Sequence, residues 1–312
     1  MADLNLSILN KLFNLSKNKG DLDYDNIVCY TSKQDAQRTY KKETGYIPGV
    51  GLVGSKVVYV ENRNGRSNPG ILQEETLERM FVKLRSQGVN VNRFRADSAS
   101  YTFRTIQAIE RYSDTFYVKA RMSDGLARII ASVEHWERVD TKEANLYRGE
   151  TCGVPFERAA KDHGQEELLK PYRFVVTKEA RRDGQINLFT GEACKYSVII
   201  TNDGDMTMDQ VVFYYNKRGA IEKEFDILKN DFGWSKLPFS KLEQNLVYLQ
   251  IMVICRNLYH FLIQLFSKRF KGLSPNFRIK KFIFRFIAIP AKWIKSSRQD
   301  KLRVYVDIHF KT

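Results

Sequence analysis

The sequence predicts an α/β protein built on one mixed β-sheet, with a β-rich insertion and a helical C-terminal region. Over residues 22–131, strand-like and helix-like segments follow in the order three strands, helix, strand, helix, strand, and a further short helix comes after them. Between about 132 and 205 this alternation stops, and glycine-rich turns separate strand candidates such as 173–177 and 196–201. From Met208 onward the pattern is mainly helical.

The first predicted strand covers residues 22–30 (LDYDNIVCY), where apolar and polar residues alternate. Asp23 and Asp25 lie on one face of this strand, since side chains on a strand repeat every two residues. A second extended run, 49–62, is broken near Gly54 and therefore predicts two more strands joined by a turn. Consecutive strands with tight connections of this kind predict antiparallel pairing.

The next segment, 73–87, has acidic residues in its first turn, apolar residues at helical spacing and Gly88 just past its end, which together predict a helix. The following elements are predicted as a strand at 91–97, a helix at 101–112, a strand at 115–120 and a short helix from Ser123. Ribonuclease H-like domains have this order, with helical crossovers joining parallel strands. In open sheets the chemistry gathers at the carboxyl ends of strands, where Asp97 would lie.

Composition excludes several classes of protein. With 43% hydrophobic and 28% charged residues among 312, the chain is an ordinary globular protein rather than a disordered or fibrous one. Its four cysteines are widely spaced and include no CxxC, which argues against a disulfide framework or a zinc ribbon and favours a reducing cytosol. Neither GxxxxGK[ST] nor GxGxxG occurs, so we expect no nucleotide cofactor.

The longest apolar stretch, 246–266, contains Arg256, Asn257 and His260. A charged side chain at the centre of a bilayer costs at least about 2.5 kcal/mol, so we expect a core helix and no membrane partner. His260 is then a satisfied core residue, since the four histidines show no metal-ligand spacing.

The charge of the chain is unevenly distributed. The net charge is +15, and residues 215–312 alone hold 20 Lys or Arg against 7 Asp or Glu, a net +13. Such a basic block beside a nearly neutral body is typical of a polyanion-binding protein, and nucleic acid is the commonest partner. The alternative is a solvated cationic face without a partner.

Four residues with complementary chemistry begin this basic block: Tyr215, Arg218, Glu222 and Lys229. On one continuous helix they would share a stripe about 60° wide. Glu222 could then hold a divalent metal, while the two cations and the phenol bind phosphate. The alternative is an exposed helix with a weak Arg-Glu pair.

This spacing, Tyr-x2-Arg-x3-Glu-x6-Lys, resembles the YREK signature of DDE-type insertion-sequence transposases, the ribonuclease H-like group that moves bacterial mobile elements. FRADSASY around Asp97 and LDYDNIVCYT around Asp25 resemble the second and first acidic motifs of the same family. The resemblance extends from about residue 20 to 267, with the β-rich insertion where this family places one.

The resemblance implies a DNA transposase that cleaves and joins strands by two-metal phosphoryl transfer, with Mg²⁺ as cofactor and Mn²⁺ as a substitute. Three carboxylates would hold the metals. Asp97 and Glu222 match the second and third acidic positions, and the first is Asp25 or Asp23, with Asp25 preferred. Tyr215, Arg218 and Lys229 would contact the phosphates of the DNA end.

Two further expectations concern DNA. A basic-aromatic run that includes Arg278, Lys280 and Lys281 would line a DNA channel, in preference to binding acidic lipid. The partner is then double-stranded DNA, both element ends and target, with a homodimer as the candidate assembly and the bacterial cytoplasm, at the nucleoid, as its location.

The resemblance and the elements divide the chain into five parts: an N-terminal remnant (1–20), the first part of the catalytic domain (21–131), the insertion (132–205), the catalytic helix and its successor (206–268) and a basic C-terminal segment (269–312). Only about 22 residues precede Asp23, where this family has a sizeable region, so we expect an N-terminally truncated element. The alternatives are a non-catalytic DNA-binding remnant and another ribonuclease H-like nuclease.

Overall fold

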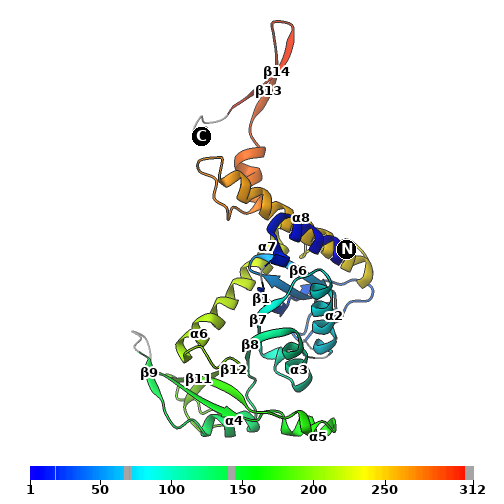
Figure 1. The fold of residues 1–312 in the computed structure, drawn as a ribbon. Helices are drawn as coiled ribbons and strands as arrows, with labels where there is room; N and C mark the ends of the chain where they lie inside the picture. The colour runs from blue at the N-terminus through cyan, green and yellow to red at the C-terminus, as the bar shows by residue number, and fades with distance from the viewer. Residues whose placement is uncertain (18, 67–69, 71, 140–144, 306–312) are drawn as a thin grey trace.

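The computed structural model describes residues 1–17, 19–66, 70, 72–139 and 145–305 (Figure 1). Among these residues the main sheet has nine strands in the order β6-β5-β1-β7-β8-β12-β11-β10-β9. The strands are β1 (Gly20–Asn26), β5 (Gly49–Val53), β6 (Lys56–Glu61), β7 (Val91–Ala96), β8 (Ser113–Lys119), β9 (Glu137–Val139), β10 (Leu146–Gly153), β11 (Tyr172–Ala180) and β12 (Cys194–Thr201). The helices are α1 (Ala2–Phe13), α2 (Gln73–Ser86), α3 (Phe103–Tyr112), α4 (Asp124–Ala131), α5 (Glu157–Asp162), α6 (Met208–Asn216), α7 (Ala220–Asp231), α8 (Leu242–Ser267) and α9 (Ile279–Phe282).

The predicted ribonuclease H-like order is confirmed in the first half of the sheet. β1, β5 and β6 form an antiparallel trio, and β1 then pairs parallel with β7, which pairs parallel with β8. α2 and α3 are the crossovers that precede β7 and β8. The carboxyl ends of β1, β7 and β8 therefore meet at one edge of the sheet.

The first predicted strand is shorter than expected. It ends at Asn26, and Cys29–Tyr30 (β2) instead pairs with Thr44–Tyr46 (β4), which also pairs with Gln37–Arg38 (β3). We call β2, β3 and β4 the small sheet. A Cβ at Gly45 would collide with the carbonyl oxygen of Cys29, so the close approach of β2 and β4 requires glycine there.

The β-rich segment continues the main sheet. β12 pairs antiparallel with β8, from Ile199↔Lys119 to Thr201↔Tyr117, and β11, β10 and β9 follow outward. The strands expected at 173–177 and 196–201 are present as β11 and β12. In Figure 1 this segment forms one end of the molecule.

The two faces of β1 have different chemistry. Leu22 and Tyr24 are buried in the core that β7 and β8 form with α1, α2 and α3. Asp23 and Asp25, one residue out of phase, lie on the opposite face, because strand side chains alternate. Alternation along one strand thus directs the apolar residues to the core and the carboxylates toward α6 and α7.

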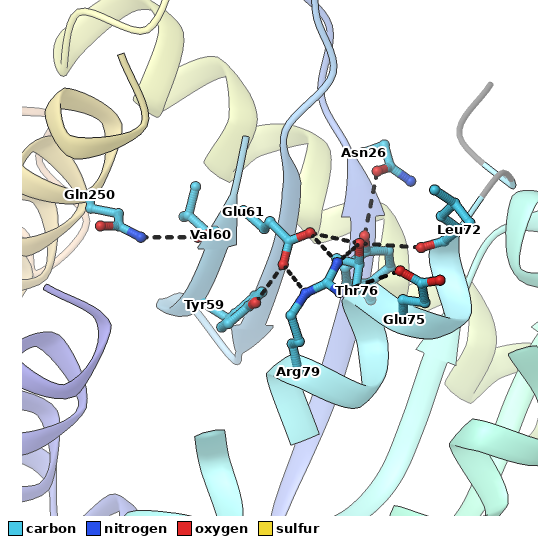
Figure 2. A network of polar contacts seen from close by, with 10 residues as sticks. Asn26, Tyr59, Val60, Glu61, Leu72, Glu75, Thr76, Arg79 and Gln250 are labelled. Atoms are coloured by element: carbon cyan, nitrogen blue, oxygen red, sulfur yellow. Dashed lines mark hydrogen bonds and ion pairs between the residues drawn. The ribbon is translucent and has the colours of Figure 1, made fainter. Parts of the chain in front are cut away.

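Side-chain amides cover the edge strand β6. Asn257 on α8 accepts from Val57 N (3.2 Å) and donates to Val57 O (2.9 Å), and Asn5 on α1 donates to the same oxygen (2.9 Å). Gln250 adds a bond to Val60 O (3.3 Å; Figure 2). An exposed edge would offer these backbone groups to another chain, so α1 and α8 protect the sheet.

α8 is the segment expected as a core helix. By length and composition alone it could cross a membrane, and one third of its most apolar 18-residue window is buried. Its buried polar residues face the fold: Asn257 bonds β6, and His260 lies within hydrogen-bond distance of Ser55 Oγ (3.3 Å) and Gln264 Nε2 (2.6 Å). Burial lowers the pKa of His260 to about 4, which keeps the ring neutral.

An ionic cluster ties the same edge strand to α2 (Figure 2). Glu61 at the end of β6 accepts two bonds from Arg79 (2.9 and 2.7 Å), one from Tyr59 (2.7 Å) and one from Thr76 (2.9 Å). Burial opposes ionisation of Glu61, but these donors outweigh it and lower its pKa. Side chains of α8 and of α2 therefore both bind the edge strand β6.

Asn257→Ala should lower the free energy of unfolding by about 2 to 3 kcal/mol, because it leaves the N–H of Val57 buried without a partner. Urea denaturation of the variant and of Gln244→Ala, at an exposed position of the same helix, measures the effect. Equal stability of the two variants would contradict the role assigned to Asn257.

Candidate active site

The register of two parallel strands brings two acidic side chains together. Asp23 lies beside Arg95 and Tyr24 beside Ala96 in the β1–β7 pairing. Because alternate residues share a face, the next pair along that face is Asp25 and Asp97. Asp97 directly follows β7 and is fixed by accepting a hydrogen bond from Ala99 N (3.0 Å).

The electrostatics of Asp25 follow from this placement beside Asp97. Burial and then the charge of Asp97 raise the pKa of Asp25 to about 6, against the opposing charge of Arg218. Arg218 Nη1 donates to Asp25 Oδ2 at 2.9 Å, with both side chains at least four-fifths buried. One guanidinium therefore compensates part of the repulsion between two carboxylates.

Asp23 has a different environment. Arg95 binds it with two hydrogen bonds, of 2.6 Å from Nε and 2.8 Å from Nη2, and donates a third to Tyr214 O on α6 (2.6 Å). The side chains of Asp23 and Arg95 are 8% and 10% exposed. Burial raises the pKa of Asp23, and the bonds from Arg95 oppose that rise. The structure thus engages Asp23 in a buried ion pair and leaves Asp25 beside Asp97.

The segment expected as one helix carrying Tyr215 to Lys229 is not a single regular helix. α6 ends at Asn216, a 3₁₀ turn covers Lys217–Gly219, and α7 begins at Ala220. The single stripe of four residues predicted for it is therefore wrong, because the tighter turn shifts the residues after it around the axis.

Two members of the predicted stripe reach the acidic pair. Arg218 bonds Asp25, and the Tyr215 hydroxyl donates to Ala96 O (3.3 Å) immediately before Asp97. Burial, with smaller effects of Asp97 and Asp25, raises the pKa of Tyr215 to about 12, so its phenol remains a hydrogen-bond donor at neutral pH.

The other two members lie apart from it. Glu222 is exposed and lines a cavity of about 750 Å³ between α7, α8 and the segment 275–279, together with Arg256. Lys229 is partly buried, near Cys29 of the small sheet. Among the described residues, no group of three or more His, Cys, Asp or Glu is placed to hold a metal. The structure therefore joins Asp25 to Asp97 but does not join Glu222 to them.

The cations expected to line a DNA channel make contacts within the chain. Arg278 binds Asp231 (2.7 and 3.0 Å) and Asp226 (2.6 Å) on α7. Lys280 is 3.9 Å from Asp231, and Lys281 lies over the ring of Phe277 (4.4 Å). In this structure Arg278 fastens the C-terminal segment to α7.

Two residues near the acidic pair, Arg95 and Tyr40, were not predicted from the sequence. Arg95 lies two positions before Asp97, so the period of the strand could have placed it on the same face. Tyr40, in the turn between β3 and β4, is about half exposed, and burial followed by the charges of Asp25 and Asp97 raises its pKa. No local pattern predicts Tyr40, because a turn distant in sequence brings it there.

The donor set of the pair fits a hard divalent cation. Both side chains supply carboxylate oxygens, the ligands that Mg²⁺ and Mn²⁺ prefer. The charge of Asp97 already opposes ionisation of Asp25, and a cation between them would reverse that effect.

Asp25→Asn should raise the free energy of unfolding at pH 7.5, without divalent metal, by about 3 kcal/mol. The folded pKa of Asp25 is about 6, above its ordinary 3.8, so wild-type stability falls as pH rises between these values. The advantage of the variant should therefore be small near pH 4 and complete above pH 6.

Arg95→Gln provides the contrast on the neighbouring strand. It should destabilise the protein by about 3 to 5 kcal/mol at pH 7.5, because Asp23 then keeps a buried charge without its partner. Urea denaturation from pH 4 to 8 tests both variants, and an Asp25→Asn protein that is less stable than wild type at pH 7.5 would refute the electrostatic assignment.

Two solved transposase structures are similar to this chain at low sequence identity. A search of curated proteins finds no match. The piggyBac transposase, solved as a synaptic complex with hairpin DNA, matches with 12% identity and a TM-score of 0.45, over 85% of this chain and 51% of that one. The catalytic domain of Mos1 mariner transposase matches with 13% identity and a TM-score of 0.25, over 46% and 74%.

The chain thus spans about half the length of the piggyBac transposase. A family model described as transposase DDE domain group 1 matches residues 20–308, which include both strands of the acidic pair and the turn that carries Arg218. The chain belongs to the transposase DDE domain family.

Proposed function

We propose that this chain is the catalytic part of a bacterial insertion-sequence transposase, which cleaves and joins DNA strands by two-metal phosphoryl transfer. The observation that supports it most is the pair of carboxylates, Asp25 and Asp97, at the carboxyl ends of β1 and β7 in a chain of the DDE family. Charge repulsion already acts between these groups, as expected of a cation site without its cation.

Asp25 and Asp97 would hold Mg²⁺, or Mn²⁺ in its place. When bound, such ions activate the attacking oxygen and stabilise the leaving one. Glu222 is proposed as the third ligand, because it lies four residues after Arg218, about one helical turn away. Since Glu222 is separate from the pair in this structure, this role requires the backbone at the 3₁₀ turn Lys217–Gly219 to rearrange.

Basic and phenolic groups around the pair would bind the phosphate under attack. Arg218 neutralises Asp25 in this structure and would be released to bind phosphate once a cation takes over that role. Tyr215 remains protonated and can donate to a phosphate oxygen, as can Tyr40 from the turn between β3 and β4. Arg95 positions β1 and α6 and touches no reacting atom in this scheme.

The net charge of +13 over residues 215–312 supports double-stranded DNA, both element ends and target, as the partner. Lys229, Lys280 and Lys281 belong to this basic part, and Arg278 would contribute by holding it in place. We further propose a homodimer in the DNA complex, acting at the nucleoid in the bacterial cytoplasm.

One observation favours a second candidate, a DNA-binding protein that has lost catalysis. Glu222 is exposed and separate from Asp25 and Asp97, so the third ligand is not in place in this structure. Such a protein would keep the salt-sensitive affinity for DNA and would not cleave it.

Asp97→Asn and Glu222→Gln should each reduce Mg²⁺-dependent nicking of DNA that carries the element ends by at least about a thousandfold, because each removes a proposed metal ligand. DNA affinity should stay within about twofold of wild type, since neither substitution removes a cation. A nicking assay beside a fluorescence-anisotropy titration measures both quantities.

Glu167→Gln, at an exposed carboxylate of the insertion, is the matched control and should nick normally. Full activity of the Glu222 variant would remove Glu222 from the site. DNA binding by a wild-type chain that never nicks with Mg²⁺ or Mn²⁺ would favour the non-catalytic candidate.

A further inference from the structure

The last two strands form a ribbon that stands apart from the rest of the fold. β13 (Ala291–Ser296) and β14 (Gln299–Val304) pair antiparallel, and Tyr305 N donates to Pro290 O (2.9 Å). No residue of this C-terminal ribbon is buried, and in Figure 1 it extends from the body at the end opposite the insertion. The basic and aromatic residues of this segment are evident in the sequence, but its two strands were not predicted.

The register of the ribbon separates its side chains into two faces. One face carries Lys292 opposite Arg303 and Ile294 opposite Lys301, so it holds three cations and no carboxylate. On the other face Trp293 lies opposite Leu302, and the carboxylate of the ribbon, Asp300, is paired in register with Lys295. The unpaired positive charge is therefore concentrated on one face of the ribbon.

The ribbon holds together through its own contacts. The cross-strand pair of Trp293 and Leu302 stabilises it from the apolar face. Its turn is unfavourable, since Ser297 and Arg298 both have positive φ (54° and 61°) without being glycine. Two-stranded ribbons alone are marginally stable in water, so an arm of this kind gains from binding a partner.

The cationic face is free to bind such a partner. Lys292, Lys301 and Arg303 make no ion pair with any described residue, unlike Arg278, which Asp226 and Asp231 already neutralise. A two-stranded ribbon fits the major groove of duplex DNA, and each lysine or arginine that meets a phosphate releases counterions.

We propose that the C-terminal ribbon is a DNA-binding arm, whose Lys292, Lys301 and Arg303 face lies against the backbone of duplex DNA. Charge complementarity and the two-stranded form of the ribbon support this partner. The inference rests on the proposed function to the extent that duplex DNA is the substrate. It adds a contact surface remote from Asp25 and Asp97.

The triple variant Lys292→Ala, Lys301→Ala, Arg303→Ala tests the arm in the full chain. At 100 mM salt its affinity for a labelled 30-base-pair duplex should fall at least about tenfold, and the slope of log K against log[salt] should decrease by about 2 to 3. The matched control, Arg158→Ala, Lys161→Ala, Lys195→Ala, removes the same charge from exposed positions of the β-rich segment and should bind nearly as wild type.

Equal loss of affinity in the two triple variants would overturn the proposal, since only total charge would then matter. Trp293→Ala with Leu302→Ala tests the other face: if this variant converts a dimer to a monomer in sedimentation while the cationic triple variant binds DNA normally, the ribbon is an interface between copies and the proposal is wrong. Circular dichroism of each variant checks that it is folded, as expected for substitutions in a ribbon that has no buried residue.

The outcome is separable from that of the proposed function. A wild-type chain that never nicks DNA, but whose affinity depends on the three ribbon cations, would refute the catalytic proposal and support the arm. If instead the chain nicks DNA in a way that depends on Asp97, and the triple variant binds DNA as tightly as wild type, the catalytic proposal is supported and the arm is refuted.

Discussion

The constraint on which the site depends is the placement of two carboxylates at the ends of adjacent parallel strands. Asp25 and Asp97 lie together because β1 and β7 pair in a register that sets Asp23 against Arg95 one step earlier. Burial, and then the charge of Asp97, raise the pKa of Asp25 to about 6, and Arg218 opposes this rise only in part. This arrangement costs folding stability, and such local cost is typical of functional sites.

Other contacts of the fold hold β1 and its two aspartates in place despite this cost. Leu22 and Tyr24 anchor β1 in the core on the face opposite the acids. The buried pair of Asp23 and Arg95 fixes the register and, through Tyr214 O, the position of α6. At the far edge, Asn257 and Asn5 satisfy the backbone of β6, so the antiparallel trio cannot extend into another chain.

Much of this was predictable from the sequence because it is local. Alternation along residues 22–26 places both aspartates on one face, and the helix and strand before Asp97 carry clear start and stop signals. What could not be predicted depends on contacts distant in sequence. The small sheet consists of two- and three-residue strands, and the ribbon turn, Ser297-Arg298, lacks the glycine that usually marks a hairpin. Glu222 was placed by helical spacing, which the 3₁₀ turn before it disturbs.

The central claim is that Asp25 and Asp97 share a divalent cation. Electron paramagnetic resonance of free Mn²⁺, titrated with metal-free protein at pH 7.5, tests it most directly and requires neither DNA nor turnover. Wild type should remove Mn²⁺ from solution, and Asp25→Asn and Asp97→Asn should each weaken binding at least about tenfold, since each deletes a charged oxygen ligand. Equal Mn²⁺ affinity of wild type and both variants would contradict the claim.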